Sequence, residues 1–502
     1  MALVTACESG GSAGEPSTQP VTVLEAEDST LLVEQAALRW VQCDNDRLLE
    51  CTTLVVPMDY SNPDGQTIEL AMARARADAQ TRERTLLINP GGPGAAGIDV
   101  LSTIVRFSDI PAAVERSHDF VSFDPRGTGA STPVRCNMDV FARQDIYPVS
   151  RAEIQRNLEI NTEFSQECFD TEGEYLQQLG SMNVVRDMNE IRKALRLSQF
   201  DFLGYSYGTR LAALYMQTYP QFTGRFVLDG SMTPETGLAD WLKGTLLPSQ
   251  RNIETLANAC RDGVVATCNP REFLAQLQSK ADELGDGPNT GEAFLFFGIL
   301  RFAAERPGFE QFLVGPLADY LETDDQEELE SIVNLLGTGE TEENPDLFSG
   351  TAYIGVFCAD DPVRHSIETI EALQSSFNAD SDLFSELLYS NVAVCTGWPA
   401  SVDPIPRIAT NQAPPSLVIG GPTDTNTPLI FAEQMAQAVG GQFLRSEHTG
   451  HTTVFSGRNR CTDSAVAVFL TSGALPATGV CEATELAGSI ERSYQPSLHM
   501  HQ

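Results

Sequence analysis

One five-residue segment constrains the fold of this chain more than any other: the sequence Gly-Tyr-Ser-Tyr-Gly at residues 204–208. The apolar run 200–203 precedes it and predicts a short buried strand, and residues 209–219 predict a helix. A serine between two glycines at a strand-to-helix junction indicates a turn so sharp that a side chain at either glycine would strike the neighbouring backbone. Ser206 would then project from the end of the strand, at the N-terminus of the helix. A tight turn that holds an ordinary serine is the alternative.

This arrangement is typical of the nucleophile elbow of α/β-hydrolases, in which the serine hydroxyl stands above the edge of the sheet. The remaining sequence fits this α/β-hydrolase fold, because apolar strands alternate with helical segments, as in a mostly parallel central sheet with helices on both faces. We expect strands at 52–60, 67–75, 85–88, 119–123, 200–205, 225–228, 414–419 and 442–446, and helices at 183–197, 209–219 and 463–470.

The pattern changes after residue 229. From about 235 to 410 the sequence is mostly helical, with acidic loops such as 322–328. A helical block between two strands of one sheet predicts a lid inserted over the carboxyl edge, where open α/β sheets bind ligands. The expected organisation is a disordered tether (1–35), a first part of the core (36–234), the helical lid (235–410), a second part of the core (411–485) and a tail (486–502).

Length and charge argue against several classes of protein. The 502 residues, 42% of them hydrophobic, suffice for a large globular core. The sequence has no run of about 18 apolar residues, so none of its segments predicts a membrane-spanning helix. The formal net charge of −37 argues against nucleic acid as a partner, because the phosphate backbone would be repelled.

The cysteines indicate an oxidising compartment. Ten of the eleven fall in couples that are close in sequence, and none has the Cys-x-x-Cys spacing of a zinc or redox site. So many cysteines in a chain of enzyme size favour up to five disulfides and an extracytoplasmic location, periplasmic or secreted, with buried free thiols as the alternative. The expected pairs are Cys43–Cys51, Cys136–Cys168, Cys260–Cys268, Cys358–Cys395 and Cys461–Cys481.

The eleventh cysteine, Cys7, follows the small-residue run 4–6 and precedes a flexible polar stretch. This pattern is typical of a bacterial lipoprotein processing site. We therefore expect a lipid on Cys7, which would attach the N-terminus to a membrane. A chance cysteine in a disordered segment is the alternative.

A serine hydroxyl is a weak nucleophile until a base removes its proton, and near neutral pH that base is a histidine held by a carboxylate. In this fold the chain order is serine, acid, histidine. Of the six histidines, His118 precedes the serine, His365 lies in the expected lid and two lie in the tail. His451, which follows a glycine just after the last strand, is therefore the expected base, with His448 as the alternative.

The catalytic acid is expected in the loop that follows the strand 414–419, and that loop contains Asp424. A helix begins shortly after it, at Thr427 and Pro428, so capping of this helix is the alternative role for Asp424. Some hydrolases place the acid one strand earlier, where this chain has Asp229. Asp229 is therefore the rival acid.

The tetrahedral intermediate of acyl transfer carries negative charge on an oxygen, which needs preorganised hydrogen-bond donors. One expected donor is the main-chain N–H of Tyr207, the residue after the nucleophile. The other is expected from the loop 89–94, Asn-Pro-Gly-Gly-Pro-Gly, where glycines let amides approach the substrate. We expect the Gly92 N–H, with Gly91 as the alternative. The segment 124–129 is expected to be structural, with Arg126 paired to a buried carboxylate.

Together these motifs resemble the prolyl aminopeptidase and tripeptidyl aminopeptidase group of α/β-hydrolases. The resemblance extends over about 40–485, and the secreted tripeptidyl branch, which is larger and contains cysteines, is the nearer match. The oxyanion loop begins with Asn89, where the proline-specific enzymes have histidine, which argues against strict proline specificity. The motifs that carry the resemblance are Gly-Gly-Pro-Gly (91–94), Phe-Asp-Pro-Arg-Gly-Thr-Gly (123–129), Gly-Tyr-Ser-Tyr-Gly-Thr (204–209), Gly-His (450–451) and the cysteine-containing segment 43–57.

The resemblance implies a serine exopeptidase that releases short peptides or single residues from peptide N-termini through an acyl-enzyme on Ser206. Such an enzyme must hold a free ammonium group, and Asp360 and Asp361 in the lid are the candidate partners, with a role as solvated surface acids as the alternative. The resemblance implies short peptides as substrates and no metal or organic cofactor. A carboxylesterase or lipase-like hydrolase with the same triad is the alternative function, and a binding module on an inactive scaffold is the third.

Overall fold

The structure is a computed structural model that describes residues 38–483, apart from 45, 78–81, 146, 236, 261–268, 286–290, 336–347, 382, 386–389 and 410–412. The expected tether and tail, and with them Cys7, lie outside the described residues. Within the described residues, no helix is both long and apolar enough to cross a membrane.

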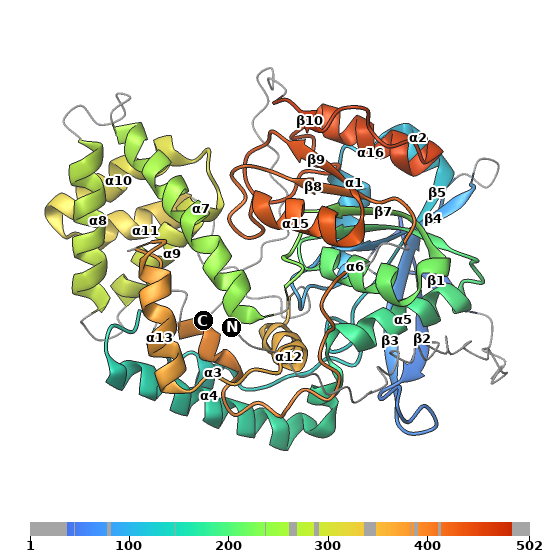
Figure 1. Cartoon of the computed structure of the whole chain (residues 1–502), viewed down its shortest axis with the longest axis horizontal. Coiled ribbons are helices and arrows are strands. Elements are labelled where there is room, and N and C mark those ends of the chain that lie inside the picture. Colours follow the sequence, from blue (N-terminus) through green and yellow to red (C-terminus); the bar gives the residue numbers. More distant parts are fainter. Residues whose placement is uncertain are drawn as a thin grey trace, which may run out of the picture. The chain divides into compact units, whose positions relative to one another are not determined.

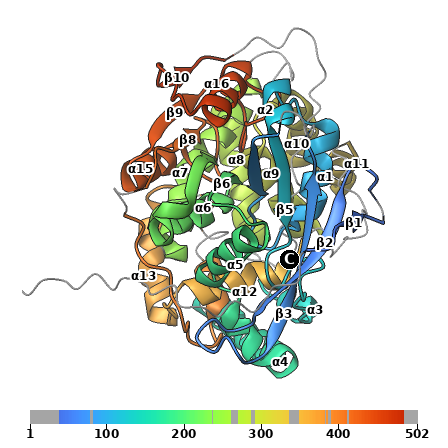
Figure 2. The same ribbon diagram turned by 90° about the vertical axis from the view of Figure 1, so that its right-hand side faces the viewer.

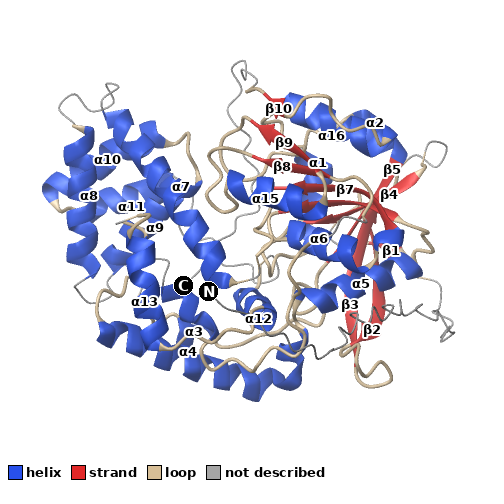
Figure 3. Cartoon of the chain, viewed as in Figure 1, coloured by secondary structure: helices blue, strands red, loops and turns tan. Residues whose placement is uncertain are grey.

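A single sheet of ten strands forms the centre of the fold, in the order β1-β2-β3-β5-β4-β6-β7-β8-β9-β10. The pairs β1–β2, β2–β3 and β3–β5 are antiparallel. Every following pair in this order, from β5–β4 to β9–β10, is parallel (Figures 1 and 3). The sheet is therefore mostly parallel, as predicted. The strands are β1 (Val41–Gln42), β2 (Glu50–Pro57), β3 (Thr67–Ala75), β4 (Arg84–Asn89), β5 (His118–Phe123), β6 (Phe200–Tyr205), β7 (Thr223–Asp229), β8 (Leu417–Gly420), β9 (Gln442–Ser446) and β10 (Val480–Cys481).

Helices cover both faces of this sheet (Figure 2). Successive side chains of a strand point to opposite faces, and in β4 Leu86 and Ile88 belong to one buried apolar cluster whereas Leu87 belongs to another. The first cluster includes side chains of α1, α2 and α16, and the second includes side chains of α5, α6 and α15. These helices are α1 (Gly97–Phe107), α2 (Ala112–Ser117), α5 (Ser181–Ala194), α6 (Gly208–Thr218), α15 (Leu429–Val439) and α16 (Arg460–Ser472).

Between β7 and β8 the described elements are helical. The described helices of this insertion are α7 (Leu238–Ala259), α8 (Pro270–Gly285), α9 (Gly291–Glu305), α10 (Glu310–Thr323), α11 (Gln326–Leu335), α12 (Gly350–Asp360), α13 (Ile367–Asn378) and η4 (Ser390–Cys395). Contacts connect α7, α8, α9, α10 and α11 into one group, whereas α12 and α13 pack near η4, α5, α4 (Arg151–Glu172) and the short 3-10 helix η1 (Gly173–Gln178). The expected boundary of the lid at 235 and 410 stays a prediction.

Two features differ from the sequence analysis. The strand expected at 52–60 ends at Pro57, and the chain then turns through residues 59–65 with hydrogen bonds from Asn62 N to Asp59 O and from Gly65 N to Asn62 O. A long helix, α4 (Arg151–Glu172), lies between β5 and β6 and was not predicted; α3 (Met138–Phe141) precedes it and η1 (Gly173–Gln178) follows it. Its signal in the sequence is the capping box of Ser150 and Glu153, which the structure contains.

Four of the five expected disulfides are present: Cys43–Cys51, Cys136–Cys168, Cys358–Cys395 and Cys461–Cys481. Cys268 lies outside the described residues, so the pair Cys260–Cys268 stays a prediction. The Cys358–Cys395 bond joins α12 to η4 and so fixes one end of the inserted segment.

Candidate active site

The segment 204–208 forms a sharp turn between β6 and α6. Ser206 adopts a left-handed backbone conformation with a φ of 54°, which is strained for a residue with a side chain. Its N–H donates to the main-chain oxygen of Asp229 at 2.9 Å, which ties the turn to the end of β7.

The two flanking glycines are required by close packing. A β-carbon on Gly204 would lie 2.5 Å from the main-chain oxygen of Gly208, and a β-carbon on Gly208 would lie 2.7 Å from Oδ1 of Asn89. Neither position has room for a side chain, which agrees with the steric argument made from the sequence.

Asp424 and His451 meet across 27 residues of sequence. Oδ2 of Asp424 lies 2.8 Å from Nδ1 of His451, and both side chains are buried. Thr427 supports the pair, because its N–H donates to Oδ1 of Asp424 and its hydroxyl donates to Oδ2, each at 2.8 Å. This arrangement fixes the orientation of the imidazole and directs the Nδ1 edge of the ring toward the carboxylate, as a serine hydrolase requires.

The two groups stabilise each other's charged forms. Burial raises the pKa of Asp424, but the charge and hydrogen bond of His451, together with the hydrogen bonds from Thr427, outweigh burial and hold this pKa below its usual value. Burial lowers the pKa of His451, but the charge and hydrogen bond of Asp424, with smaller contributions from Asp229 and Glu305, raise it above its usual value. The pair therefore stabilises the imidazolium form of His451, as the predicted role of this residue as the base requires.

The imidazole lies against the residue after β7, the strand to whose end the turn of Ser206 is hydrogen-bonded. A β-carbon on Gly230, the residue after Asp229, would lie 3.2 Å from Cε1 of His451. The hydroxyl of Tyr205, in the elbow, donates to the main-chain oxygen of Val454, in the loop that carries His451, at 3.1 Å. The turn of Ser206 and the loop of His451 are thus in direct contact at the carboxyl end of β6 and β7.

The two rival residues have other partners. Asp229 accepts the N–H groups of Thr453 and Val454 at Oδ2, each at 2.8 Å, so it anchors the loop that carries His451. Burial raises its pKa to about 6. Nδ1 of His448 lies 3.0 Å from the main-chain oxygen of Ser446, and burial lowers its pKa to about 4.

The loop after β4 lies beside Ser206. A β-carbon on Gly91 would lie 3.0 Å from Cβ of Ser206 and 3.0 Å from the main-chain nitrogen of Tyr207. The N–H of Gly91 donates to Oδ1 of Asn89 at 3.0 Å. This bond already engages the N–H of Gly91. The N–H groups of Gly92 and Tyr207 therefore stay the predicted oxyanion donors. Tyr207 directly precedes α6, so its N–H also lies at the positive end of a helix dipole.

Asp360 and Asp361, at the end of α12 in the insertion, are both buried and hydrogen-bonded inside the protein. Asp360 accepts the N–H and the hydroxyl of Ser181. Asp361 accepts the N–H of Leu238, the first residue of α7, at 2.9 Å and the N–H of Val363 at 2.8 Å. Their expected role in ammonium binding stays a prediction, and these internal partners do not favour it.

Two other outcomes concern charged groups. Arg126 is buried and donates to both oxygens of Asp187, from Nε at 2.7 Å and from Nη2 at 2.6 Å, as predicted for a structural arginine. Glu305, at the end of α9, was not predicted from the sequence, and its charge acts on His451. No motif marks Glu305, because only the folding of the insertion brings α9 toward the His451 loop.

The chain is similar to known hydrolases over most of its length. A model of the α/β hydrolase fold matches residues 84–262, and a model of TAP-like proteins matches residues 381–481. Serine protease Hip1 of Mycobacterium tuberculosis is 27% identical over 462 residues, which cover 86% of this chain and 86% of that protein. Tripeptidyl aminopeptidase of Streptomyces lividans is 27% identical over 473 residues, which cover 89% of this chain and 86% of that protein. Carboxylesterase B of Mycobacterium tuberculosis is 27% identical over 461 residues, which cover 86% of each.

These similarities agree with the geometry of the site. The residues matched by the first model include the elbow. Those matched by the second include both Asp424 and His451. Two of the three relatives carry the names of serine-type or N-terminal peptidases. The chain thus has the α/β-hydrolase fold with a TAP-like carboxyl-terminal region, and it is a serine hydrolase.

Proposed function

We propose that this protein is a serine aminopeptidase that releases short peptides or single residues from the N-termini of peptide substrates. The observation that carries the proposal is the contact between the strained elbow of Ser206 and the loop in which His451 pairs with Asp424. The relatives named as serine protease and tripeptidyl aminopeptidase support peptides as substrates.

In the proposed reaction the Ser206 hydroxyl attacks the scissile carbonyl carbon while His451 takes its proton. Asp424 stabilises the imidazolium, and the N–H groups of Gly92 and Tyr207 stabilise the oxyanion. His451 then donates its proton to the leaving amine, which leaves an acyl-enzyme on Ser206. Water attacks this ester with His451 again as the base, and the released acid is the N-terminal fragment.

Glu305 is the group that we propose as the partner of the substrate's free ammonium. It ends α9, where the preceding residue, Ala304, accepts a hydrogen bond from Nδ2 of Asn252 at 2.7 Å. The same Nδ2 donates to the main-chain oxygen of Thr423, next to the catalytic acid, at 3.1 Å. Glu305 pairs with Arg301 at 2.7 Å, and its side chain is 23% exposed, so it is not fully buried. Its position would limit cleavage to residues near the N-terminus.

The first test uses a peptide-library digest followed by mass spectrometry of the released fragments. We expect fragments from the free N-terminus only, and none from N-acetylated copies of the same peptides. Cleavage inside acetylated peptides would show an endopeptidase and would contradict the proposal. Ser206→Ala, which removes the nucleophile, is the control for contaminating peptidases.

The second test concerns Glu305 itself. In Glu305→Gln we expect kcat/KM on peptidyl anilides with a free ammonium to fall by roughly 10- to 100-fold, the worth of one charge-assisted hydrogen bond. Hydrolysis of a short nitrophenyl ester without an ammonium should be unchanged at the plateau of the pH profile, where the small effect of Glu305 on the pKa of His451 no longer acts. Glu322→Gln, an exposed acid on α10, is the matched control. Equal losses on both substrates would argue against ammonium recognition.

Hydrolysis of carboxylic esters is the second candidate function, and the similarity to carboxylesterase B favours it. The same triad cleaves both bonds, so the site geometry agrees with either. Peptidyl anilides and short-chain nitrophenyl esters separate the two functions. If only the esters are hydrolysed, the peptidase proposal fails.

We also propose an extracytoplasmic location. Four disulfides within the described residues favour an oxidising compartment, because thiols are kept reduced in the cytosol. Attachment through a lipid on Cys7 is part of this proposal. Incorporation of a labelled fatty acid into the intact protein, and its loss in Cys7→Ser, would test it.

A further inference from the structure

A buried chain of hydrogen bonds connects the residue after the nucleophile to the lid. The hydroxyl of Tyr207 is hydrogen-bonded to the hydroxyl of Ser181, which in turn donates to Oδ2 of Asp360 at 2.5 Å. The N–H of Ser181 donates to Oδ1 of Asp360 at 2.7 Å. All three residues are almost fully buried, at 3% exposed for Tyr207, 0% for Ser181 and 1% for Asp360.

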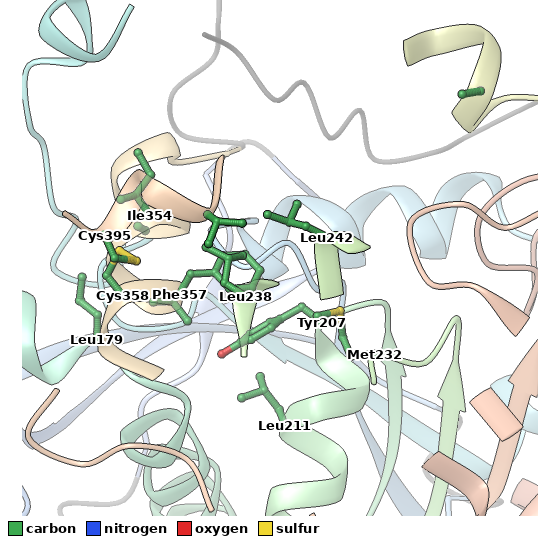
Figure 4. Close-up of a cluster of buried hydrophobic side chains, with 14 of the residues drawn as sticks. Leu179, Tyr207, Leu211, Met232, Leu238, Leu242, Ile354, Phe357, Cys358 and Cys395 are labelled. Carbon is green, nitrogen blue, oxygen red and sulfur yellow. A yellow bond between two sulfur atoms is a disulfide. The ribbon is translucent and has the colours of Figure 1, made fainter. Parts of the chain in front are cut away.

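The three residues come from separate parts of the fold. Tyr207 directly precedes α6, Ser181 is the first residue of α5, and Asp360 is the last residue of α12 in the inserted segment. Figure 4 shows the ring of Tyr207 between Leu211 on α6 and the side chains of Leu238 and Phe357 from the insertion. The centroids of the Tyr207 and Phe357 rings lie 6.5 Å apart.

The place of Asp360 is held from two sides. A β-carbon on Gly180 would lie 3.3 Å from its Oδ1, so the start of α5 packs directly against the carboxylate. Two residues earlier on α12, Cys358 forms the disulfide to Cys395 (Figure 4). The end of α12 therefore cannot shift without disturbing Ser181.

The burial of Asp360 at the end of α12 costs folding free energy for two reasons. A buried carboxylate loses its hydration, and an acid at the C-terminus of a helix faces the negative end of the dipole. Arg210 on α6, which is also buried, offsets part of this cost through its charge. The neighbouring Asp361 accepts the N–H of the first residue of α7, and Oδ1 of Asp360 accepts that of the first residue of α5, Ser181. Capping of α5 does not account for Oδ2 of Asp360, which accepts the Ser181 hydroxyl that holds the Tyr207 hydroxyl.

We propose that Asp360 is a positioning residue for the oxyanion hole. Through Ser181 it fixes the side chain of Tyr207, and so the main-chain N–H that this residue contributes beside Ser206. The geometry of the oxyanion hole then depends on the docking of α12, which makes the inserted segment part of the catalytic apparatus. The inference rests on the proposed serine chemistry, and it holds for peptides and esters alike.

The oxyanion forms only after Ser206 attacks the substrate, and this decides how kcat and KM should change in the variants. An oxyanion donor acts on the transition state and not on the bound substrate, so its displacement lowers kcat and leaves KM nearly unchanged. Loss of a whole donor costs about 10²- to 10³-fold in kcat. A donor that is only loosened should cost less, roughly 10- to 100-fold.

The experiment is a double-mutant cycle on the full chain with Tyr207→Phe and Asp360→Asn. The measurements are kcat and KM on a nitrophenyl ester and the rate of Ser206 phosphonylation by a fluorophosphonate probe. Each single variant should lose 10- to 100-fold in kcat and in phosphonylation rate, with KM within about twofold of wild type. The double variant should be no slower than the slower single variant, because both changes break one chain of hydrogen bonds.

Two further variants complete the design. Tyr215→Phe removes the hydroxyl of an equally buried tyrosine on α6 and should leave the rates unchanged. Ser181→Ala breaks the chain in the middle, and it replaces Asp360→Asn in the cycle if that variant does not fold. Rates within twofold of wild type in Tyr207→Phe, a change in KM alone, or losses that multiply in the double variant would overturn the inference. A wild-type protein that takes no label would instead refute the serine chemistry itself.

Discussion

At the scale of single residues, two buried aspartates of the site differ in their hydrogen-bond partners and in the direction of their pKa shifts. Asp424 accepts hydrogen bonds from His451 and Thr427, and its pKa lies below the usual value. Asp229 accepts the main-chain N–H groups of Thr453 and Val454, and burial raises its pKa to about 6. The first is therefore suited to stabilise an imidazolium, and the second to hold the loop of His451.

This division predicts distinct pH profiles. In wild type kcat/KM should rise with pH through a pKa above 6.5, because His451 acts as a neutral base and Asp424 raises its pKa. Asp424→Asn removes that charge, so the midpoint should move to lower pH while the plateau falls by about 10⁴-fold. The measurement is kcat/KM from pH 5 to 9 at constant ionic strength.

Asp229→Asn is the matched control, because an amide oxygen still accepts the N–H groups of Thr453 and Val454. Its plateau should stay far above that of Asp424→Asn, and its midpoint should move little, since Asp229 contributes less to the pKa of His451. If Asp229→Asn were the more damaging of the two, the acid would have been assigned to the wrong strand.

At the scale of elements, the sequence predicted what depends on local pattern. The strand 200–205 agrees residue for residue with β6, because its apolar run ends at the glycine of the turn. β1 and β10 have two residues each, too few for any periodicity. The ammonium site was assigned to Asp360 from its place in the lid alone, and sequence could not show that Ser181 occupies both its oxygens. Such contacts arise only when α5 and α12 pack together.

The close packing of the main chain at the elbow predicts the effect of an added methyl group there. Gly204→Ala should abolish activity and lower the free energy of unfolding, because its β-carbon would collide with the main-chain oxygen of Gly208. Gly298→Ala is the control, since Gly298 lies inside α9 with nothing within 4 Å of the added carbon. This control should keep activity and gain about 0.5–1 kcal/mol in stability. Urea unfolding and kcat measure both effects, and a stable, active Gly204→Ala would show that the turn is not strained.

At the scale of the whole molecule, the net negative charge and the burial of carboxylates both lower the stability of the fold as pH rises. The chain has a formal net charge of −37, so its self-repulsion increases as carboxylates ionise. Several carboxylates are also buried: Asp229 at the end of β7, Asp360 at the end of α12 and Asp463 in α16. Burial raises the pKa of Asp463 to about 7 and that of Asp360 to about 6. Asp463 accepts the N–H of Phe455 at 2.6 Å, so it holds the same loop as Asp229.

Stability and activity should therefore respond oppositely to pH. An aspartate whose pKa is raised by folding binds its proton more tightly in the folded state, so its contribution to stability is lost as pH rises from about 4 to 7. The charged form of His451, whose pKa is also raised, loses its contribution as pH rises above 6.5. The free energy of unfolding should fall from pH 5 to pH 8, whereas kcat/KM should rise over the same range.

Urea unfolding across this range, repeated in 1 M NaCl, separates the two causes. Salt screens the repulsion between surface charges but not the burial of single carboxylates, so a slope that survives in salt belongs to the buried groups. Asp463→Asn cannot ionise and keeps an acceptor for Phe455, so it should flatten that residual slope while the loop stays in place. A stability that increases from pH 5 to pH 8 would mean that these aspartates are ionised without penalty, and the loop of His451 would then need another explanation for its rigidity.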